Sequence, residues 1–221
     1  MKYRIYLPFH YDPEKEYPVL LFLHGAGHRG DDNLAPIKGM PYALYSHESV
    51  PMQDVILLVP QCPKNYQWVD TPWSKGNYNI NSIPESKAMA CLVELLNQVL
   101  TQYSVDESRV YALGLSMGGF GTWDLVSRHP ELFAAAVPIC GGGSVQAAEV
   151  LKNIPIWTTH GDKDTSVPLA GTRQMVSAIQ QAGGKLIHYT EFAGMGHSIG
   201  AHTAKQKEIM EWLFQQKRGI N

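Results

Sequence analysis

A serine near the middle of the chain has the surroundings of an enzyme nucleophile. Ser116 is the central residue of the Gly-Leu-Ser-Met-Gly segment 114–118, which follows a strand-like run at 109–113 and precedes a helix-like stretch at 119–128. A strand, a sharp turn between small residues and a helix form a nucleophile elbow, which strains the serine backbone and directs Oγ out of the sheet. The segment therefore predicts a serine that attacks a carbonyl carbon.

Candidates for the partner acid and base follow at the ends of two later strands. The apolar run 156–160 leads into a polar turn that carries Asp162 and Asp164. The strand-like run 185–192 leads into a glycine-rich loop that carries His197. Serine, aspartate and histidine in this chain order, each after a strand, are the arrangement of an α/β-hydrolase and not of chymotrypsin or subtilisin.

Each of these residue types has a defined task in acyl transfer. A serine hydroxyl is a poor nucleophile near neutral pH, so His197 is expected to take its proton and return it to the leaving group. A carboxylate must hold the imidazole in the right tautomer, and Asp164 is favoured because it lies deeper in the turn and reaches the His197 loop more easily. Asp162 remains the alternative, with support of the turn through backbone hydrogen bonds as its expected role.

Three other histidines receive weaker assignments. His24 and His160 precede glycines at strand ends and are expected to be structural. His202 is only a reserve candidate for the base, because helix capping or exposure on the last helix also explains a histidine there.

The negative oxygen of a tetrahedral intermediate needs two preorganised donors. The backbone N–H of Met117 is one candidate, because it follows the nucleophile at the start of a helix. The loop 24–27, His-Gly-Ala-Gly, follows the strand-like run 19–23, and its glycines allow close approach of the backbone. Ala26 is the expected second donor.

Composition limits the classes of partner. The chain has 221 residues, 44% of them hydrophobic and 17% charged, with a net charge of −2 and no basic run. We expect no nucleic-acid or anionic-membrane partner, because those surfaces need clustered basic residues. No apolar stretch reaches the ~18 residues of a membrane span, and no signal-like core opens the chain. Cys62, Cys91 and Cys140 have no metal-binding spacing; buried free thiols are favoured, with one disulfide left open.

Strands and helices alternate along the chain, which is typical of a parallel sheet covered on both faces. Strands are expected at 3–7, as an antiparallel edge, and at 19–23, 55–59, 109–113, 134–139, 156–160 and 185–192; helices are expected at 84–103, 119–128, 169–182 and 201–217. This predicts one α/β-hydrolase domain over 1–221 with about seven strands. Only about ten residues separate 143 from 154, too few for a lid, so we expect an open site.

Long stretches resemble a known group of enzymes. The segments 114–125 and 133–143, with the opening 3–8, the loop 23–27 and the motif Pro-Gln-Cys-Pro at 60–63, are similar to the polyhydroxybutyrate depolymerase and feruloyl esterase branch of α/β-hydrolases. That branch includes carbohydrate esterase family 1 and proteins labelled predicted peptidases. The resemblance implies hydrolysis of carboxylic esters without metal or cofactor, and it places the acid at the second aspartate of His-Gly-Asp-x-Asp, Asp164. It also implies a secreted or periplasmic module, here with its leader removed.

Substrate selection is expected from the long segment 61–84, which carries Tyr66, Trp68, Trp73 and Tyr78. Long loops at the carboxyl edge of a sheet commonly line sites, and Trp68 and Trp73 are suited to stack on a phenolic acyl group or a sugar. Gln61 is a further candidate contact. Anchoring of the loop is an equally good explanation for each aromatic residue. The favoured function is hydrolysis of short-chain or aromatic acyl esters, with feruloyl or acetyl esters of plant polysaccharides as candidates; a serine peptidase and a non-catalytic binding module are the alternatives.

Overall fold

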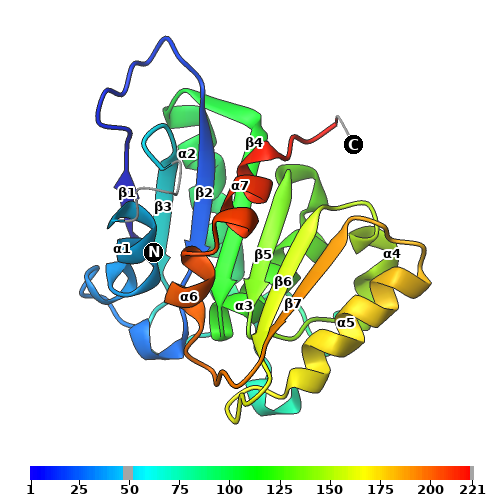
Figure 1. Ribbon diagram of the computed structural model, residues 1–221. Coiled ribbons are helices and arrows are strands. Elements are labelled where there is room, and N and C mark those ends of the chain that lie inside the picture. Colours follow the sequence, from blue (N-terminus) through cyan, green and yellow to red (C-terminus); the bar gives the residue numbers. More distant parts are fainter. Residues whose placement is uncertain (47–51, 220–221) are drawn as a thin grey trace.

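The computed structural model of the protein describes residues 1–46 and 52–219, and its seven strands form one sheet (Figure 1). The strands are β1 Lys2–Tyr6, β2 Tyr17–Leu23, β3 Ile56–Gln61, β4 Val105–Leu115, β5 Ala135–Ile139, β6 Ile156–Gly161 and β7 Ile187–Phe192. Their order is β1-β3-β2-β4-β5-β6-β7, with β1 antiparallel to β3 and every other pair parallel. The predicted α/β fold with an antiparallel edge strand is confirmed.

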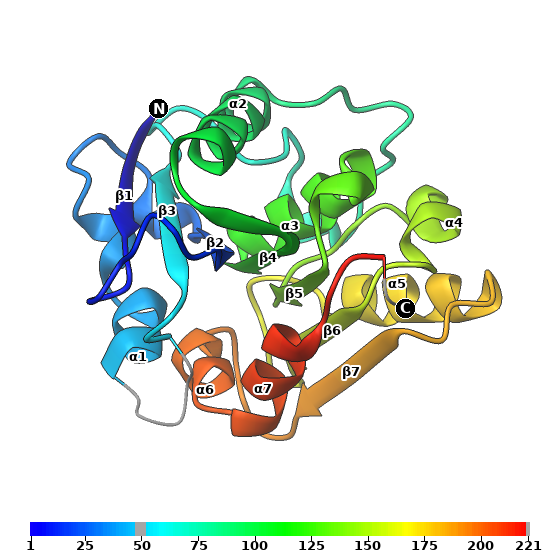
Figure 2. The same cartoon turned by 90° about the horizontal axis from the view of Figure 1, so that it is seen from above.

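Helices cover both faces of this sheet (Figure 2). Helices α1 Met40–Ser46, α6 Gly200–Ala204 and α7 Lys207–Gln215 pack on one face. The other face carries α2 Lys87–Gln102, α3 Met117–Arg128, α4 Ala148–Leu151 and α5 Leu169–Gln181. Strand β2 shows why its sequence is apolar throughout: Leu21 and Leu23 join the core under α2 and α3, while Leu20 and Phe22 join the core under α1 and α7. Successive side chains of a strand point to opposite faces, and here both faces are buried.

The observed helices differ from the expected ones in their bounds, most at the start of α2 and in the last expected helix. Helix α2 begins at Lys87 rather than at 84, because the Ser86 hydroxyl accepts a hydrogen bond from the Met89 N–H (3.0 Å) and caps the helix. The single helix expected at 201–217 is wrong. It is divided into α6 and α7, and Gln206, directly before α7, has an extended backbone that interrupts the helix.

The segment between β5 and β6 contains a short 3-10 turn and the one-turn helix α4. No helix within the described residues is long and apolar enough to cross a membrane. All three cysteines are free, and Cys62 and Cys140 are buried as expected. Cys91 is exposed on α2, so the expectation of a buried thiol is wrong there.

Candidate active site

Ser116 lies at the junction of β4 and α3, at the carboxyl edge of the sheet. Its φ of 59° and ψ of −121° are a strained backbone conformation for a residue with a side chain. The Ile139 carbonyl accepts from its N–H (2.8 Å), and its own carbonyl accepts from Phe120 N–H (3.0 Å), so both sides of the turn are held. A Cβ on Gly118 would lie 1.9 Å from the Leu23 carbonyl oxygen, which explains the need for glycine after the nucleophile.

The fold brings Ser116, Asp164 and His197 together from three different loops. Nε2 of His197 lies 2.7 Å from the Ser116 Oγ, and its Nδ1 lies 2.6 Å from Asp164 Oδ2. A carboxylate only accepts hydrogen bonds, so the neutral ring carries its proton on Nδ1 and Nε2 is left to accept from the serine hydroxyl. The side chain of Asp164 is fully buried and that of His197 is 25% exposed. This geometry suits general-base activation of Ser116.

The Asp164 carboxylate is surrounded by donors. Its Oδ1 accepts from the N–H groups of Ser166 (2.8 Å) and Val167 (3.0 Å), and its Oδ2 faces rings of His197 and His160. Burial by itself raises the pKa of this carboxyl, but the hydrogen bonds from His197 and the two amides outweigh burial and hold the pKa below its usual value. The Asp164 carboxylate is therefore ionised in the folded protein near neutral pH.

The other candidate acid and base have different surroundings. Asp162 Oδ1 accepts a backbone hydrogen bond from the Gly194 N–H (2.7 Å), which joins its turn to the loop that carries His197. His202 is exposed on α6, where its ring nitrogen lies 3.1 Å from the Gln206 amide nitrogen. The hydrogen-bonded set at Ser116 uses neither of them.

The two predicted oxyanion donors belong to segments next to Ser116, the loop after β2 and the start of α3. Among the described residues, no acceptor is found for the N–H of Ala26 or Met117. Each of the two is the first residue of a helical segment, a 3-10 turn at Ala26–His28 and α3 at Met117, where amides have no partner within the helix. The loop lies close to the nucleophile, since a Cβ on Gly25 would lie 3.5 Å from the Cβ of Ser116.

His24 holds the loop that carries Ala26. Its Nε2 accepts from the Cys62 N–H (3.0 Å), so its proton must be on Nδ1, which donates to the Gly25 carbonyl (2.7 Å). Burial lowers the pKa of His24 to about 4, which keeps the ring neutral. The Gly25 carbonyl and the Ala26 N–H belong to one peptide plane, so this hydrogen bond also fixes where the Ala26 N–H points.

A cavity of about 510 Å³ opens beside Ser116 and His197. Its apolar lining comes from Phe22, Met40, Trp73, Leu115 and Val167, and its basic lining from His28 and Lys38. Sequence reasoning missed all of these except Trp73. The segment that carries Lys38 and Met40 has no chemical signature, and it reaches the cavity through the packing of α1 on the sheet.

Two of the three predicted substrate contacts are wrong. Trp68 is fully buried, and its indole N–H donates to the His24 carbonyl (3.1 Å) beneath the cavity loop. Gln61 is also buried; its amide accepts from the Asn33 N–H (2.7 Å) and donates to the His28 carbonyl (3.1 Å). Both side chains support loops rather than meet a ligand. Of the three, only Trp73 lies in the cavity lining.

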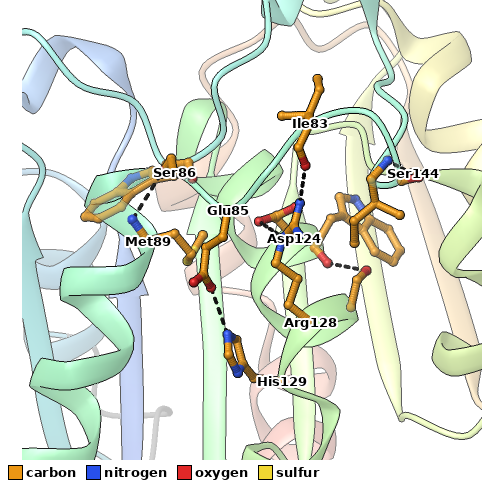
Figure 3. A network of polar contacts seen from close by, with 12 residues as sticks. Ile83, Glu85, Ser86, Met89, Asp124, Arg128, His129 and Ser144 are labelled. Carbon is orange, nitrogen blue, oxygen red and sulfur yellow. Dashed lines mark hydrogen bonds and ion pairs between the residues drawn. The ribbon is translucent and has the colours of Figure 1, made fainter.

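The loop 62–86, between β3 and α2, is fixed to α3 by a polar network (Figure 3). The Tyr78 hydroxyl donates to Asp124 Oδ1 (2.7 Å), and Arg128 joins Asp124 Oδ2 (2.9 Å) to the Ile83 carbonyl (2.7 Å). The Glu85 carboxylate lies 2.8 Å from the His129 ring in the same network. Anchoring is therefore the role of Tyr78 and Trp68, and the loop they hold carries Trp73.

One cluster within the described residues has the residue types of a metal site. The ligand atoms of Cys140, His160 and Asp164 lie within 4.8 Å of one another. Burial raises the pKa of the Cys140 thiol far above its usual value, which opposes the thiolate that a metal needs. The Asp164 oxygens also have donors already, so hydrogen bonding explains this cluster better than metal binding does.

Comparison with known proteins places these features in a family. Residues 1–198 match the sequence pattern of a family described as "Putative esterase". A bifunctional acetylxylan esterase/xylanase of Neocallimastix patriciarum is 27% identical over 115 residues, which are 45% of this chain and 17% of that protein. Feruloyl esterase B of Thermothelomyces thermophilus is 27% identical over 62% of this chain and 43% of its own length.

Solved structures show the same architecture. A thermostable esterase superposes with a TM-score of 0.86 at 36% identity, covering 98% of this chain and 59% of that one. The feruloyl esterase module of Clostridium thermocellum superposes with a TM-score of 0.68 at 15% identity, which shows a shared fold. The chain thus spans little more than half of the thermostable esterase and much less of the first curated relative.

Proposed function

The chain belongs to the Esterase family, and on that premise we propose that it hydrolyses carboxylic esters through an acyl-enzyme on Ser116. The observation that carries the proposal is the hydrogen-bonded series Ser116, His197, Asp164, which opens into a cavity beside two unpaired backbone amides. These contacts supply a candidate for each of the nucleophile, its base, the group that orients the base and the site for negative charge.

The reaction follows from the positions of the protons. As Oγ of Ser116 attacks the ester carbonyl carbon, the hydroxyl proton passes to Nε2 of His197. The carbonyl π electron pair moves onto the carbonyl oxygen, and the resulting oxyanion accepts hydrogen bonds from the Ala26 and Met117 N–H groups. The imidazolium is stabilised by the Asp164 carboxylate. It then gives its proton to the alkoxide as the carbon–oxygen bond breaks, which leaves an acyl group on Ser116. Water repeats the sequence and releases the acid.

The cavity lining supports a proposal for the substrate class. Trp73 packs in one cluster with Val167, and both line the cavity together with apolar Met40, a lining that suits a short or phenolic acyl group. The acyl group is placed against these side chains, and the alcohol remains toward solvent, where a sugar polymer has room. Relatives named for acetylxylan and feruloyl esters agree with this class.

Ester hydrolysis by the native protein tests the proposal. We would measure turnover of p-nitrophenyl esters of increasing acyl length and of methyl ferulate, with Ser116→Ala and Ser198→Ala as matched variants. Ser198 also lines the cavity, so its loss controls for removal of a hydroxyl there. We expect turnover that falls by at least ~10³-fold in Ser116→Ala and is retained in Ser198→Ala.

Other outcomes would contradict it. Equal turnover in Ser116→Ala would show that Ser116 is not the nucleophile. Faster Ser116-dependent cleavage of anilides than of matched esters would indicate a peptidase. Binding of these esters without turnover would indicate a binding module.

A further inference from the structure

We propose that His160 is a positioning residue of this site, and that it donates Nε2–H to the same Asp164 oxygen to which His197 donates. His160 lies in β6, four residues before Asp164, and its side chain is fully buried. Its Nε2 is 3.1 Å from Asp164 Oδ2, and the Nδ1 of His197 is 2.6 Å from the same atom. The inference rests on the proposed function, because it assigns a task within that catalytic series.

The surroundings of the ring decide where its proton is. Nε2 faces two groups that can only accept: it forms a hydrogen bond with the Val167 carbonyl oxygen (3.3 Å), and the Asp164 carboxylate oxygen lies nearer, at 3.1 Å, as the partner of an ion-pair contact. A bare Nε2 lone pair would be repelled by both. Nε2 therefore carries a proton, whatever the state of Nδ1.

The second ring nitrogen is satisfied from α5. Nδ1 lies 2.7 Å from the Thr172 hydroxyl, which is also 2.9 Å from the Gly141 carbonyl oxygen. In this arrangement the hydroxyl donates to the Gly141 carbonyl, which also accepts from the Trp123 indole N–H (3.2 Å), so the carbonyl keeps a donor when the threonine proton points to Nδ1 instead. Burial lowers the pKa of His160, which favours this neutral ring with its single proton on Nε2. By donating to Nδ1, the Thr172 hydroxyl stabilises the tautomer whose proton is on Nε2.

The consequence is a carboxylate whose orientation does not depend on His197. Oδ1 is held by two amides of its own turn, whereas His197 lies on a partly exposed loop. Without His160, His197 would be the one imidazole that donates to Asp164 Oδ2. With His160 present, Oδ2 is also connected to β6, which carries His160, and through Thr172 to α5, and both elements belong to the buried core. Asp164 then keeps its place while the charge and position of His197 change during each cycle.

Activity of three variants tests the role. His160→Leu removes the donor and keeps an apolar side chain in the core; His160→Gln retains an N–H that can reach Asp164; Thr172→Val removes the hydroxyl that sets the tautomer. His160 is not among the cavity-lining residues, so we expect kcat for a p-nitrophenyl ester to fall roughly tenfold in His160→Leu with KM within about twofold, which corresponds to one hydrogen bond. His160→Gln should recover most of this loss, and Thr172→Val should lie between.

A measurement of the native protein separates this inference from the proposed function. In ¹⁵N-histidine NMR of the folded protein, His160 should appear as the neutral Nε2–H tautomer at neutral pH, whether or not any ester is cleaved. A bare Nε2 would overturn the inference. A folded His160→Leu variant with native kcat would also overturn the inference. A His160→Gln variant whose kcat is no higher than that of His160→Leu would do the same, because the ring would then contribute only its volume to the core. Absence of Ser116-dependent turnover in the native protein would instead contradict the proposed function and leave the NMR result to decide the role of His160.

Discussion

Replacing Tyr78 with phenylalanine removes one hydroxyl from the network that fixes the loop 62–86 to α3. That hydroxyl and its acceptor, Asp124, are both buried, and they are 2.7 Å apart. A hydrogen bond to a charged group contributes about 1.5–3 kcal/mol, and its loss leaves Asp124 Oδ1 without this donor while Arg128 holds Oδ2. We therefore expect the free energy of unfolding to fall by about 2 kcal/mol, which for a chain of this size lowers Tm by about 4–8 °C.

The loss should depend on pH in a stated direction. Burial raises the pKa of Asp124 above its usual value, although the hydrogen bonds from Arg128 and Tyr78 oppose this. The folded protein therefore binds the Asp124 proton more readily than the unfolded chain, so the group favours folding most in acid and that contribution is lost as pH rises through the folded pKa. Tyr78→Phe removes an opposing hydrogen bond and raises this pKa further. The destabilisation should thus be larger at pH 7 than at pH 4.

Urea unfolding of the native protein and of Tyr78→Phe at both pH values is the assay. Tyr66→Phe is the matched control in the same loop, because Tyr66 is exposed and, within the described residues, its hydroxyl makes no hydrogen bond; we expect a change within about 0.5 kcal/mol. A loss below about 0.5 kcal/mol in Tyr78→Phe, or a loss that is equal at the two pH values, would refute this account of the network.

Three further predictions concern the site. Burial lowers the pKa of His24 from 6.5 to about 4, so as pH falls the unfolded chain binds a proton on this ring before the folded protein does. The free energy of unfolding should therefore drop by roughly 3 kcal/mol in all between pH 6.5 and pH 4. Urea unfolding of His24→Gln should lack this pH-dependent drop. A Cβ on Gly161 would lie 2.4 Å from the Gly196 carbonyl oxygen and displace the loop of His197, so Gly161→Ala should lower kcat for ester hydrolysis at least ~10-fold. Gly196→Ala is the control: its Cβ would lie no nearer than 3.8 Å to another residue, so kcat should stay within about twofold. Trp73→Ala should raise KM for methyl ferulate more than for p-nitrophenyl acetate; equal changes would show that Trp73 does not contact the acyl group.

Features carried by short stretches of chain could be predicted without the structure. The strand–turn–helix at Ser116, the order of serine, aspartate and histidine, and the buried strands all follow from local patterns. Adjacent residues determine a turn, and a short continuous apolar run indicates a buried strand. The choice of Asp164 over Asp162 also came from position in the turn, and the observed hydrogen bonds agree with it. The break between α6 and α7 was missed because no glycine or proline marks it.

The sequence by itself therefore determined the fold class and the candidate nucleophile, base and acid, while the tertiary structure decided which other residues reach them. Trp68 and Trp73 are five residues apart in one loop and equally apolar, yet packing beneath the β2 end buries the first and leaves the second in the cavity. His160 ends one strand-like run and His197 follows another, but only the positions of β6, α5 and β7 show that both rings lie near one carboxylate oxygen. Burial and ring contacts depend on residues distant in the chain, and no local pattern records them.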